Sequence, residues 1–342
     1  MISERRLAIL NLIIEHYIQT GEPMGSKTLC SLLPYSVSSA TVRNEMAYLS
    51  QIGYLEQRHT SGGRIPSKAS YRYYVDNLME PQELSDYEKG IISELLSVNA
   101  GDPERLLTDA AALLSQYTNC TGFCCLLEDP LDCIQGVDLI PAGNSKAMLV
   151  MLTAGSKIKS SLINIQKPIS DDFRYLFYEV IKRLFAGTAL SEVNIALIQR
   201  CVLIAGEKVF DLLPVLTSLC SLCAEASKSK LVLEGETNLL SHGEELGNEV
   251  YKILSFMTDK KRLTDFSKSF AESNAKQAMF IGDENPLYEL KNTTTAVSKF
   301  TYGRNQAATL GFIGSTRIDY EKIIPVSEYI FSTVDNLLAN NH

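Results

Sequence analysis

Apolar residues recur at helical spacing from the start of the chain. Residues 3–20 place leucine, isoleucine and tyrosine three and four positions apart, which predicts an amphipathic helix. The same spacing predicts a short second helix over residues 26–33, which Pro34 ends, and a third over residues 39–51. The first fifth of the chain is therefore expected to be a three-helix head.

The third predicted helix has two faces of different chemistry. At about 100° per residue, Val42, Met46 and Leu49 fall on one side and are expected to pack on the other helices. The opposite face is small or polar, with the donors and acceptors that suit base edges in a major groove. Ser38 or Ser39 is expected to cap the helix, and Gly53 to end it in a left-handed conformation. The groove-facing set is Ala40, Thr41, Asn44, Tyr48 and Gln51.

A glycine-tipped hairpin is expected directly after this helix. Residues 54–57 alternate weakly as a strand, residues 60–63 (TSGG) are a turn signal, and Pro66 stops the return strand. Cations on such a tip reach a phosphate or the minor groove. The alternative is an ordinary surface hairpin, but its place after a polar-faced helix favours a wing.

The predicted DNA contacts come from the third helix, the wing and the helix expected over residues 67–79. Arg43 is placed for a phosphate or for an ion pair with Glu45 or Glu56. Lys68 and Arg72 are placed for the DNA backbone or, equally, for a solvated face. The full set is Ser39, Thr41, Arg43, Asn44, Tyr48, Gln51, Arg58, His59, Arg64, Lys68 and Arg72.

The remainder of the chain mixes helices and strands, so the predicted fold class is α+β and multidomain. Residues 121–165 contain short β-rich runs that predict one antiparallel sheet, and residues 170–227 return to helix. A second sheet is expected from the later strands, and residues 320–340 predict a final helix. One domain interrupted by an insertion and two consecutive domains both fit this order. The later strands are expected at residues 231–235, 278–281, 293–298 and 306–314, with helices at 242–257 and 260–270.

Charge separates the head from the rest. The whole chain carries −8, but residues 1–78 hold eight Lys/Arg against six Asp/Glu, so the head is +2 and the remainder −10. An acidic body repels DNA and leaves contact to the head. Glu15 and His16 break the first apolar run and no run of about eighteen apolar residues exists, so neither a signal peptide nor a membrane span is expected. A cytoplasmic location follows.

Motifs for other chemistry are missing. The sequence has no GxxxxGK[ST] loop, no GxSxG elbow and no metal spacing among its four histidines, so it predicts no enzyme, cofactor or metal. Asp283 and Glu284 are interpreted as a surface pair. Cys220 and Cys223 have redox or metal spacing, but an apolar helical setting favours a buried pair. A ligand- or redox-sensing regulator that uses these two cysteines is the alternative function.

Several motifs in the same order resemble the HrcA family of bacterial heat-inducible transcription repressors. The likeness is dense over residues 5–78 and continues in patches to the C-terminus. Ser70 and Ser315 depart from it, standing where the family has glycine and proline. The motifs are residues 21–29 (GEPMGSKTL), 38–46 (SSATVRNEM), 59–67 (HTSGGRIPS), 71–76 (YRYYVD), 233–240 (LEGETNLL), 281–285 (IGDEN) and 310–320 (LGFIGSTRIDY).

The resemblance implies a winged helix-turn-helix head over residues 1–80. It implies a GAF-like α+β domain split over residues 87–130 and 228–342, with an inserted α+β dimerisation domain over residues 131–227. It also implies a homodimer that binds an inverted-repeat operator (the CIRCE element) upstream of chaperone operons. A GroEL-type chaperonin would maintain the active repressor, and heat stress would inactivate it.

Overall fold

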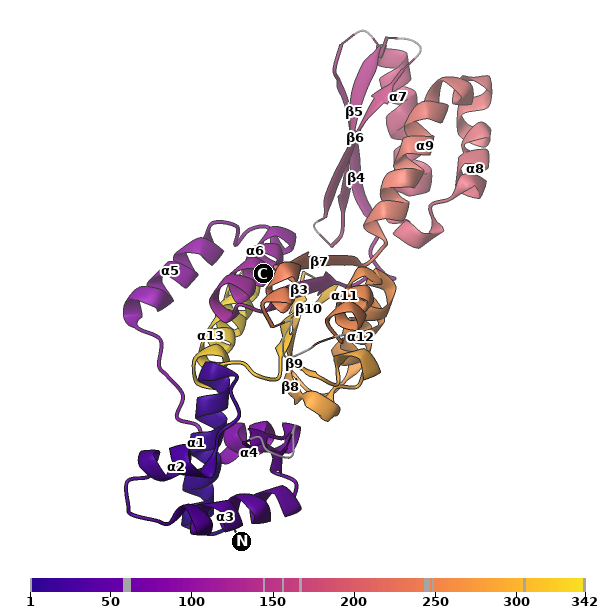
Figure 1. Cartoon of the computed structure of the whole chain (residues 1–342). Helices are drawn as coiled ribbons and strands as arrows, with labels where there is room; N and C mark the ends of the chain where they lie inside the picture. The colour runs from indigo at the N-terminus through magenta and orange to yellow at the C-terminus, as the bar shows by residue number, and fades with distance from the viewer. Residues whose placement is uncertain are drawn as a thin grey trace. The chain divides into compact units, whose positions relative to one another are not determined.

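The chain forms two compact units. A computed structural model describes residues 2–57, 63–143, 145–155, 157–165, 168–242, 247, 249–303 and 306–340 (Figure 1). The first unit is built from Met1–Cys125, Leu231–Phe300 and Thr309–Asn341, and the second from Leu126–Lys230 and Thr301–Ala308. Both units combine helices and strands, which confirms the mixed α/β character predicted from the sequence.

The first unit begins with helices and a short hairpin, hereafter the head. Its helices are α1 (Glu4–Thr20), α2 (Ser26–Leu32), α3 (Ser39–Gln51) and α4 (Lys68–Asn77). Strands β1 (Leu55–Glu56) and β2 (Ile65–Pro66) pair antiparallel between α3 and α4, and Met24 bridges to Arg64 beside them. Leu10, Ile13 and Ile14 of the predicted apolar face of α1 are fully enclosed, and so is Ile9, which was not assigned to that face. Burying these four side chains contributes most of the stability of the helix, since a lone helix of this length is marginal in water.

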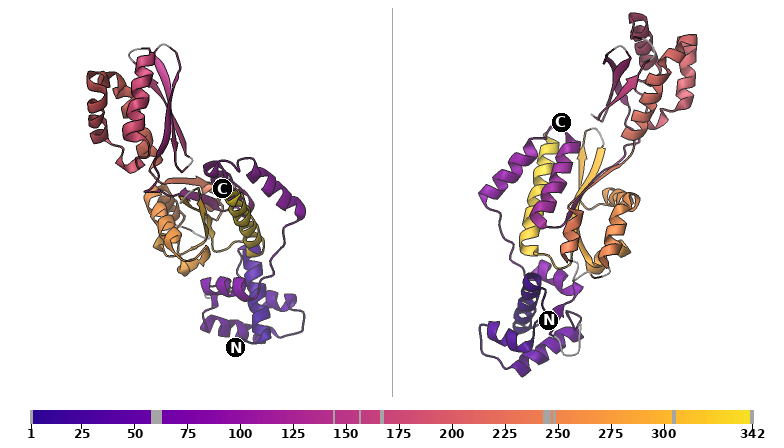
Figure 2. Two further views of the ribbon diagram at one scale, coloured as in Figure 1. Left: turned by 180° about the vertical axis from the view of Figure 1, so that it is seen from behind. Right: turned by 45° about the horizontal axis from the view of Figure 1, so that its top comes forward.

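A five-stranded sheet forms the rest of the first unit, in the order β7-β3-β10-β9-β8. Helices α5, α6 and α13 lie on one face of it and α11 and α12 on the other (Figure 2). The strands are β3 (Thr121–Leu126), β7 (Lys230–Glu234), β8 (Gln277–Ile281), β9 (Thr293–Tyr302) and β10 (Gln306–Ser315). The helices are α5 (Asp86–Ser97), α6 (Pro103–Thr118), α11 (Glu249–Thr258), α12 (Lys260–Glu272) and α13 (Tyr320–Ala339).

The placement of β3 corrects the predicted sheets. Residues 122–127 were expected to pair with the β-rich runs that follow them, but β3 lies between β7 and β10 instead. All six residues of β3 are buried, as in a central strand covered on both faces, whereas the following strands alternate. The chain leaves this sheet after β3 and re-enters it in the neighbouring strand β7, so the second unit interrupts the first.

The second unit is a three-stranded sheet covered by helices. Strands β4 (Ile134–Pro141), β5 (Lys146–Thr153) and β6 (Ile158–Asn164) form an antiparallel meander, as predicted for these residues. Alternate side chains of β5, among them Leu149 and Met151, join the core. Leu212 and Leu216 reach the same core from α9 (Val209–Ala226). The other helices are α7 (Asp171–Val180), continued by a π-helical turn (Ile181–Phe185), and α8 (Ile195–Ala205).

One stretch, Ile195–Ala226, is apolar and long enough by composition to cross a membrane. The structure breaks it at Gly206, whose φ of +57° ends α8 and starts a new direction. The second half, α9, buries Leu212, Leu216 and Leu219 against the sheet. Its apolar character is therefore explained by packing within the second unit.

Candidate nucleic-acid interface

Helix α3 is fixed at both ends as the sequence predicts. The Oγ atom of Ser38 accepts the backbone N–H of Thr41 at 3.1 Å, which satisfies one of the free donors at the helix start. Gly53 follows the last turn with φ +86°. Val42 and Leu49 are fully buried, and Met46 is nearly so. The buried face leaves the opposite face of α3 turned away from the core.

That outer face presents the predicted polar residues. Arg43, Asn44 and Gln51 are exposed, and Asn44 lies at the centre of the helix. Thr41 and Ser39 are half-buried and lie nearer the helix start. The hydroxyl of Ser39 lies 3.0 Å from that of Ser26, and the hydroxyl of Thr41 lies 2.9 Å from that of Ser38. The first turn of α3 is thereby tied to α2, while the exposed amides remain available to a partner.

Tyr48 carries a partner that sequence reasoning missed. The guanidinium of Arg6, from α1, lies over its ring with 3.6 Å to the centroid. Arg6 also donates from Nε to Oε2 of Glu45 at 2.6 Å, and Arg5 lies 3.9 Å from the other carboxylate oxygen. Glu45 thus pairs with α1 and not with Arg43. The only sequence signal was the Arg5-Arg6 pair at the start of the first helix.

The wing residues are described in part. Arg64 pairs through its backbone with Met24, with N···O distances of 2.9 and 3.0 Å, and its guanidinium donates to Oε1 of Gln57. These three bonds hold Arg64 at the base of the hairpin. Arg58 and His59 lie outside the described residues.

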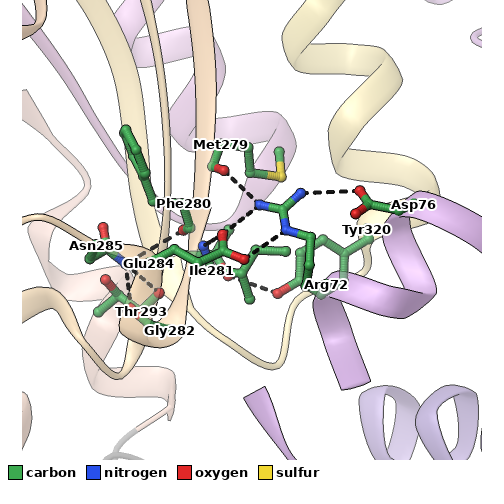
Figure 3. Close-up of polar contacts among 11 residues, drawn as sticks. Arg72, Asp76, Met279, Phe280, Ile281, Gly282, Glu284, Asn285, Thr293 and Tyr320 are labelled. Atoms are coloured by element: carbon green, nitrogen blue, oxygen red, sulfur yellow. Dashed lines mark hydrogen bonds and ion pairs between the residues drawn. The ribbon is translucent and has the colours of Figure 1, made fainter. Parts of the chain in front are cut away.

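Lys68 and Arg72 are engaged by carboxylates of the first unit. Figure 3 shows the contacts of Arg72. Lys68 Nζ lies 3.0 Å from Oδ1 of Asp283, and Arg72 donates to both carboxylate oxygens of Glu284, at 2.8 and 2.6 Å. The carboxylates belong to the 3₁₀ turn Gly282–Glu284, directly after β8. Neither sequence interpretation, DNA backbone or solvated face, included this partner.

The cysteine pair lies on α9. Cys223 is buried and Cys220 half-buried. Burial raises the pKa of the Cys223 thiol to about 12 and also raises the pKa of Cys220, which disfavours the reactive thiolate. Among the described residues, no group of three or more His, Cys, Asp or Glu side chains could hold a metal ion.

Comparison with known proteins decides the family. A family model described as the HrcA protein C-terminal domain matches residues 104–324. The chain belongs to the HrcA family. The heat-inducible transcription repressor HrcA of Acetivibrio thermocellus is 32% identical over 332 residues, covering 97% of this chain and 95% of the relative. The same-named protein of Clostridium botulinum (strain Eklund 17B) is 32% identical over 347 residues, covering 99% and 98%.

The fold agrees with a solved relative. A crystal structure described only as that of a hypothetical protein matches with a TM-score of 0.74 and 22% identity, covering 100% of both chains. At this identity the match shows the fold alone. The HrcA resemblance inferred from the sequence motifs is thus confirmed by the family model and by curated relatives over nearly the whole length.

Proposed function

We propose that this protein is a heat-inducible transcription repressor that binds an inverted-repeat operator, the CIRCE element, as a homodimer. The proposal rests on the two faces of helix α3. It is capped by Ser38, buried along one face and exposes Asn44 and Gln51 on the other. That geometry suits insertion into a major groove, where amides pair with adenine edges.

The head supplies the remaining parts of a winged helix-turn-helix over residues 1–80. The β1–β2 hairpin follows α3 directly and takes the role of the wing. The net charge of +2 on residues 1–78 against −10 elsewhere favours contact with phosphates through the head. In this assignment Arg43 and Arg64 contact the DNA backbone, while Asn44, Tyr48 and Gln51 contact bases.

Dimerisation is assigned to the insertion, residues 131–227, within the second unit. Its helices α8 and α9 expose large apolar side chains at Ile195, Leu203 and Phe210, which are 74%, 87% and 70% exposed. Exposed apolar side chains of this size are typical of surfaces that a partner covers. The split domain of residues 87–130 and 228–342 would be the GAF-like part. Two heads held on one dimer bind more tightly together than either small head binds alone.

The proposed regulation is maintenance by a GroEL-type chaperonin in the cytoplasm and inactivation on heat stress. The redox alternative gains no support, because burial raises the pKa of both Cys220 and Cys223. We assign no catalytic residue and no cofactor.

The test compares a duplex carrying the inverted repeat with a scrambled duplex, with and without chaperonin. Asn44→Ala should weaken binding to the inverted repeat by about 1–3 kcal/mol while leaving binding to the scrambled duplex unchanged. Asn77→Ala, an exposed asparagine at the end of α4, is the matched control and should change neither. Equal losses on both duplexes for Asn44→Ala would refute the groove assignment.

A further inference from the structure

Arg72 on α4 is hydrogen-bonded to β8 and to the turn after it, about 200 residues later in the chain. Arg72 donates from Nε and Nη2 to the two oxygens of Glu284, and Nη2 also donates to the carbonyl oxygen of Met279 at 2.7 Å (Figure 3). Nη1 donates to Asp76, one turn further along α4, at 3.2 Å. The fork-on-fork geometry with Glu284 fixes direction as well as distance. The guanidinium therefore already has partners on every nitrogen.

The carboxylate that receives Arg72 is itself held in place. Glu284 accepts the backbone N–H of Ile281 at 2.9 Å, and its pKa is held below the ordinary value by the Arg72 guanidinium. Asn285 Nδ2 donates to the carbonyl oxygens of Gly282 and Thr293, which ties the turn to β9. The turn is thus organised by its own bonds around the position that Arg72 occupies.

Gly282 makes this close approach possible. Its φ is +60°, and a β-carbon built there would lie 2.7 Å from Cδ of Lys68. A side chain at this position would push the stem of Lys68, and with it α4, away from the turn. The turn after β8 is therefore shaped to receive α4.

Aromatic and polar contacts from α4 and α1 fix the head at further points. The hydroxyl of Tyr74 donates to Oε1 of Glu321 at 2.6 Å, and the ring of Tyr71 lies 5.8 Å from that of Tyr320. Tyr71, Tyr74 and Tyr320 are all buried. Arg317 Nη1 donates to the carbonyl oxygen at the end of α1, Ile18, at 3.1 Å. These contacts restrict rotation of the head about any single bond.

We propose that Arg72 and Glu284 form a latch that sets the orientation of the head for a two-site operator, so that Arg72 acts as a positioning residue and does not contact phosphate. The inference rests on the proposed function. A dimer gains from both half-sites only when its two heads are held at the required spacing and angle. A loosened head retains its own contacts with one half-site.

The test uses the full-length chain and two duplexes, one with the whole inverted repeat and one with a single half-site. Glu284→Gln should lower affinity for the whole repeat by about tenfold or more, and affinity for the half-site by less than about twofold. Arg72→Lys, which keeps the charge but loses the fork, should do the same. Asp76→Asn also removes a carboxylate from Arg72, but within α4, so it is the matched control and should retain wild-type binding.

Other roles for Arg72 and Glu284 predict different changes in DNA binding. Were Glu284 only shielding a phosphate contact, Glu284→Gln would bind both duplexes more tightly. Were Arg72 itself on a phosphate, Arg72→Ala would lower the salt slope on the half-site by about 0.9. Either result, or unchanged binding to the whole repeat, would overturn the latch. The charge swap Arg72→Glu with Glu284→Arg should recover part of the loss if the pair itself is responsible.

A second measurement needs no DNA. The segment between α4 and α5 is held to α13 by the backbone N–H of Gln82, which donates to the carbonyl oxygen of Glu321 at 2.9 Å. Loss of the latch should let α4 move, and this neighbouring segment would then be held less firmly. Glu284→Gln should therefore speed cleavage after the exposed Glu83 by a glutamate-specific protease, with an unchanged circular-dichroism spectrum. If Glu284→Gln is cleaved faster but the wild type shows no preference for the operator, the contact between Arg72 and Glu284 holds the head and the proposed operator is wrong. Operator preference with unchanged cleavage and binding in Glu284→Gln would reject the latch alone.

Discussion

Arg6→Ala tests how the face of α3 that we propose reads DNA is held in place. The substitution removes a guanidinium that lies 3.6 Å from the centroid of the Tyr48 ring and 2.6 Å from Oε2 of Glu45. Tyr48 then gains rotational freedom, and Glu45 keeps only the longer contact of 3.9 Å to Arg5. A carboxylate that has lost its nearer cation, on the helix proposed to face DNA, would also repel phosphate.

The magnitude follows from the two lost interactions. A cation over an aromatic ring contributes about 0.5–1 kcal/mol at an exposed site. The ion pair is more enclosed, with Arg6 26% and Glu45 16% exposed, and we expect about another 1 kcal/mol from it. Together they amount to about 1.5–2 kcal/mol, which corresponds to a loss of roughly 10- to 30-fold in operator affinity. Fluorescence anisotropy with labelled duplexes at fixed salt measures this directly.

A double-mutant cycle with Tyr48→Ala separates positioning from direct contact. If Arg6 acts through Tyr48, the loss of binding free energy in the double variant should be smaller than the sum of the two single losses by about 0.5–1 kcal/mol. Arg5→Ala is the matched control, since Arg5 is 51% exposed and is not one of the cations found over an aromatic ring. Additive losses, or an Arg6→Ala loss as large on scrambled DNA as on the operator, would refute the reasoning.

Three further outcomes are expected. A methyl group at Gly311 would lie 2.1 Å from the carbonyl oxygen of Ala296, so Gly311→Ala should destabilise the first unit by about 1–3 kcal/mol, and an unchanged Tm in calorimetry would contradict that close approach. Because Arg72 holds the pKa of Glu284 below its ordinary 4.5, the pair stabilises the fold above that pH and loses this contribution as pH falls through the folded-state value. The stability difference between wild type and Glu284→Gln should therefore shrink on acidification below about pH 4.5, and a difference that widened would reject the sign. Leu203 is 87% exposed, so Leu203→Glu should weaken the dimer by about tenfold or more in sedimentation equilibrium, and an unaltered dimer would exclude α8 from the interface.

Local patterns predicted the parts of the fold that depend on neighbours in sequence. The cap at Ser38, the buried face of α3 and the left-handed Gly53 all follow from interactions within four residues, and all are confirmed. The antiparallel strands of residues 134–164 were predicted from short β-rich runs, which are a local signal as well.

Sheet membership and distant ion pairs were not predictable in this way. The six residues of β3 carry no alternation, which marks a strand buried on both faces but does not say which strands flank it. Arg72 and Glu284 are 212 residues apart, and each alone is typical of a solvated surface. The assignment of domains and of DNA contacts stays a prediction, as does the role of Arg58 and His59.

Lys68 and Arg72 lie one turn apart on α4, yet the structure gives them different prospects for meeting DNA. Lys68 pairs with one carboxylate, Asp283, whose side chain is 69% exposed, and an exposed pair of this kind contributes little stability. A phosphate can take that place at small cost. Arg72 would have to give up both oxygens of Glu284 and the carbonyl of Met279 together, in a bidentate geometry that holds better than an isolated pair. In the proposed arrangement, α4 can therefore offer Lys68 to the operator while Arg72, one turn later, fixes the head to the sheet.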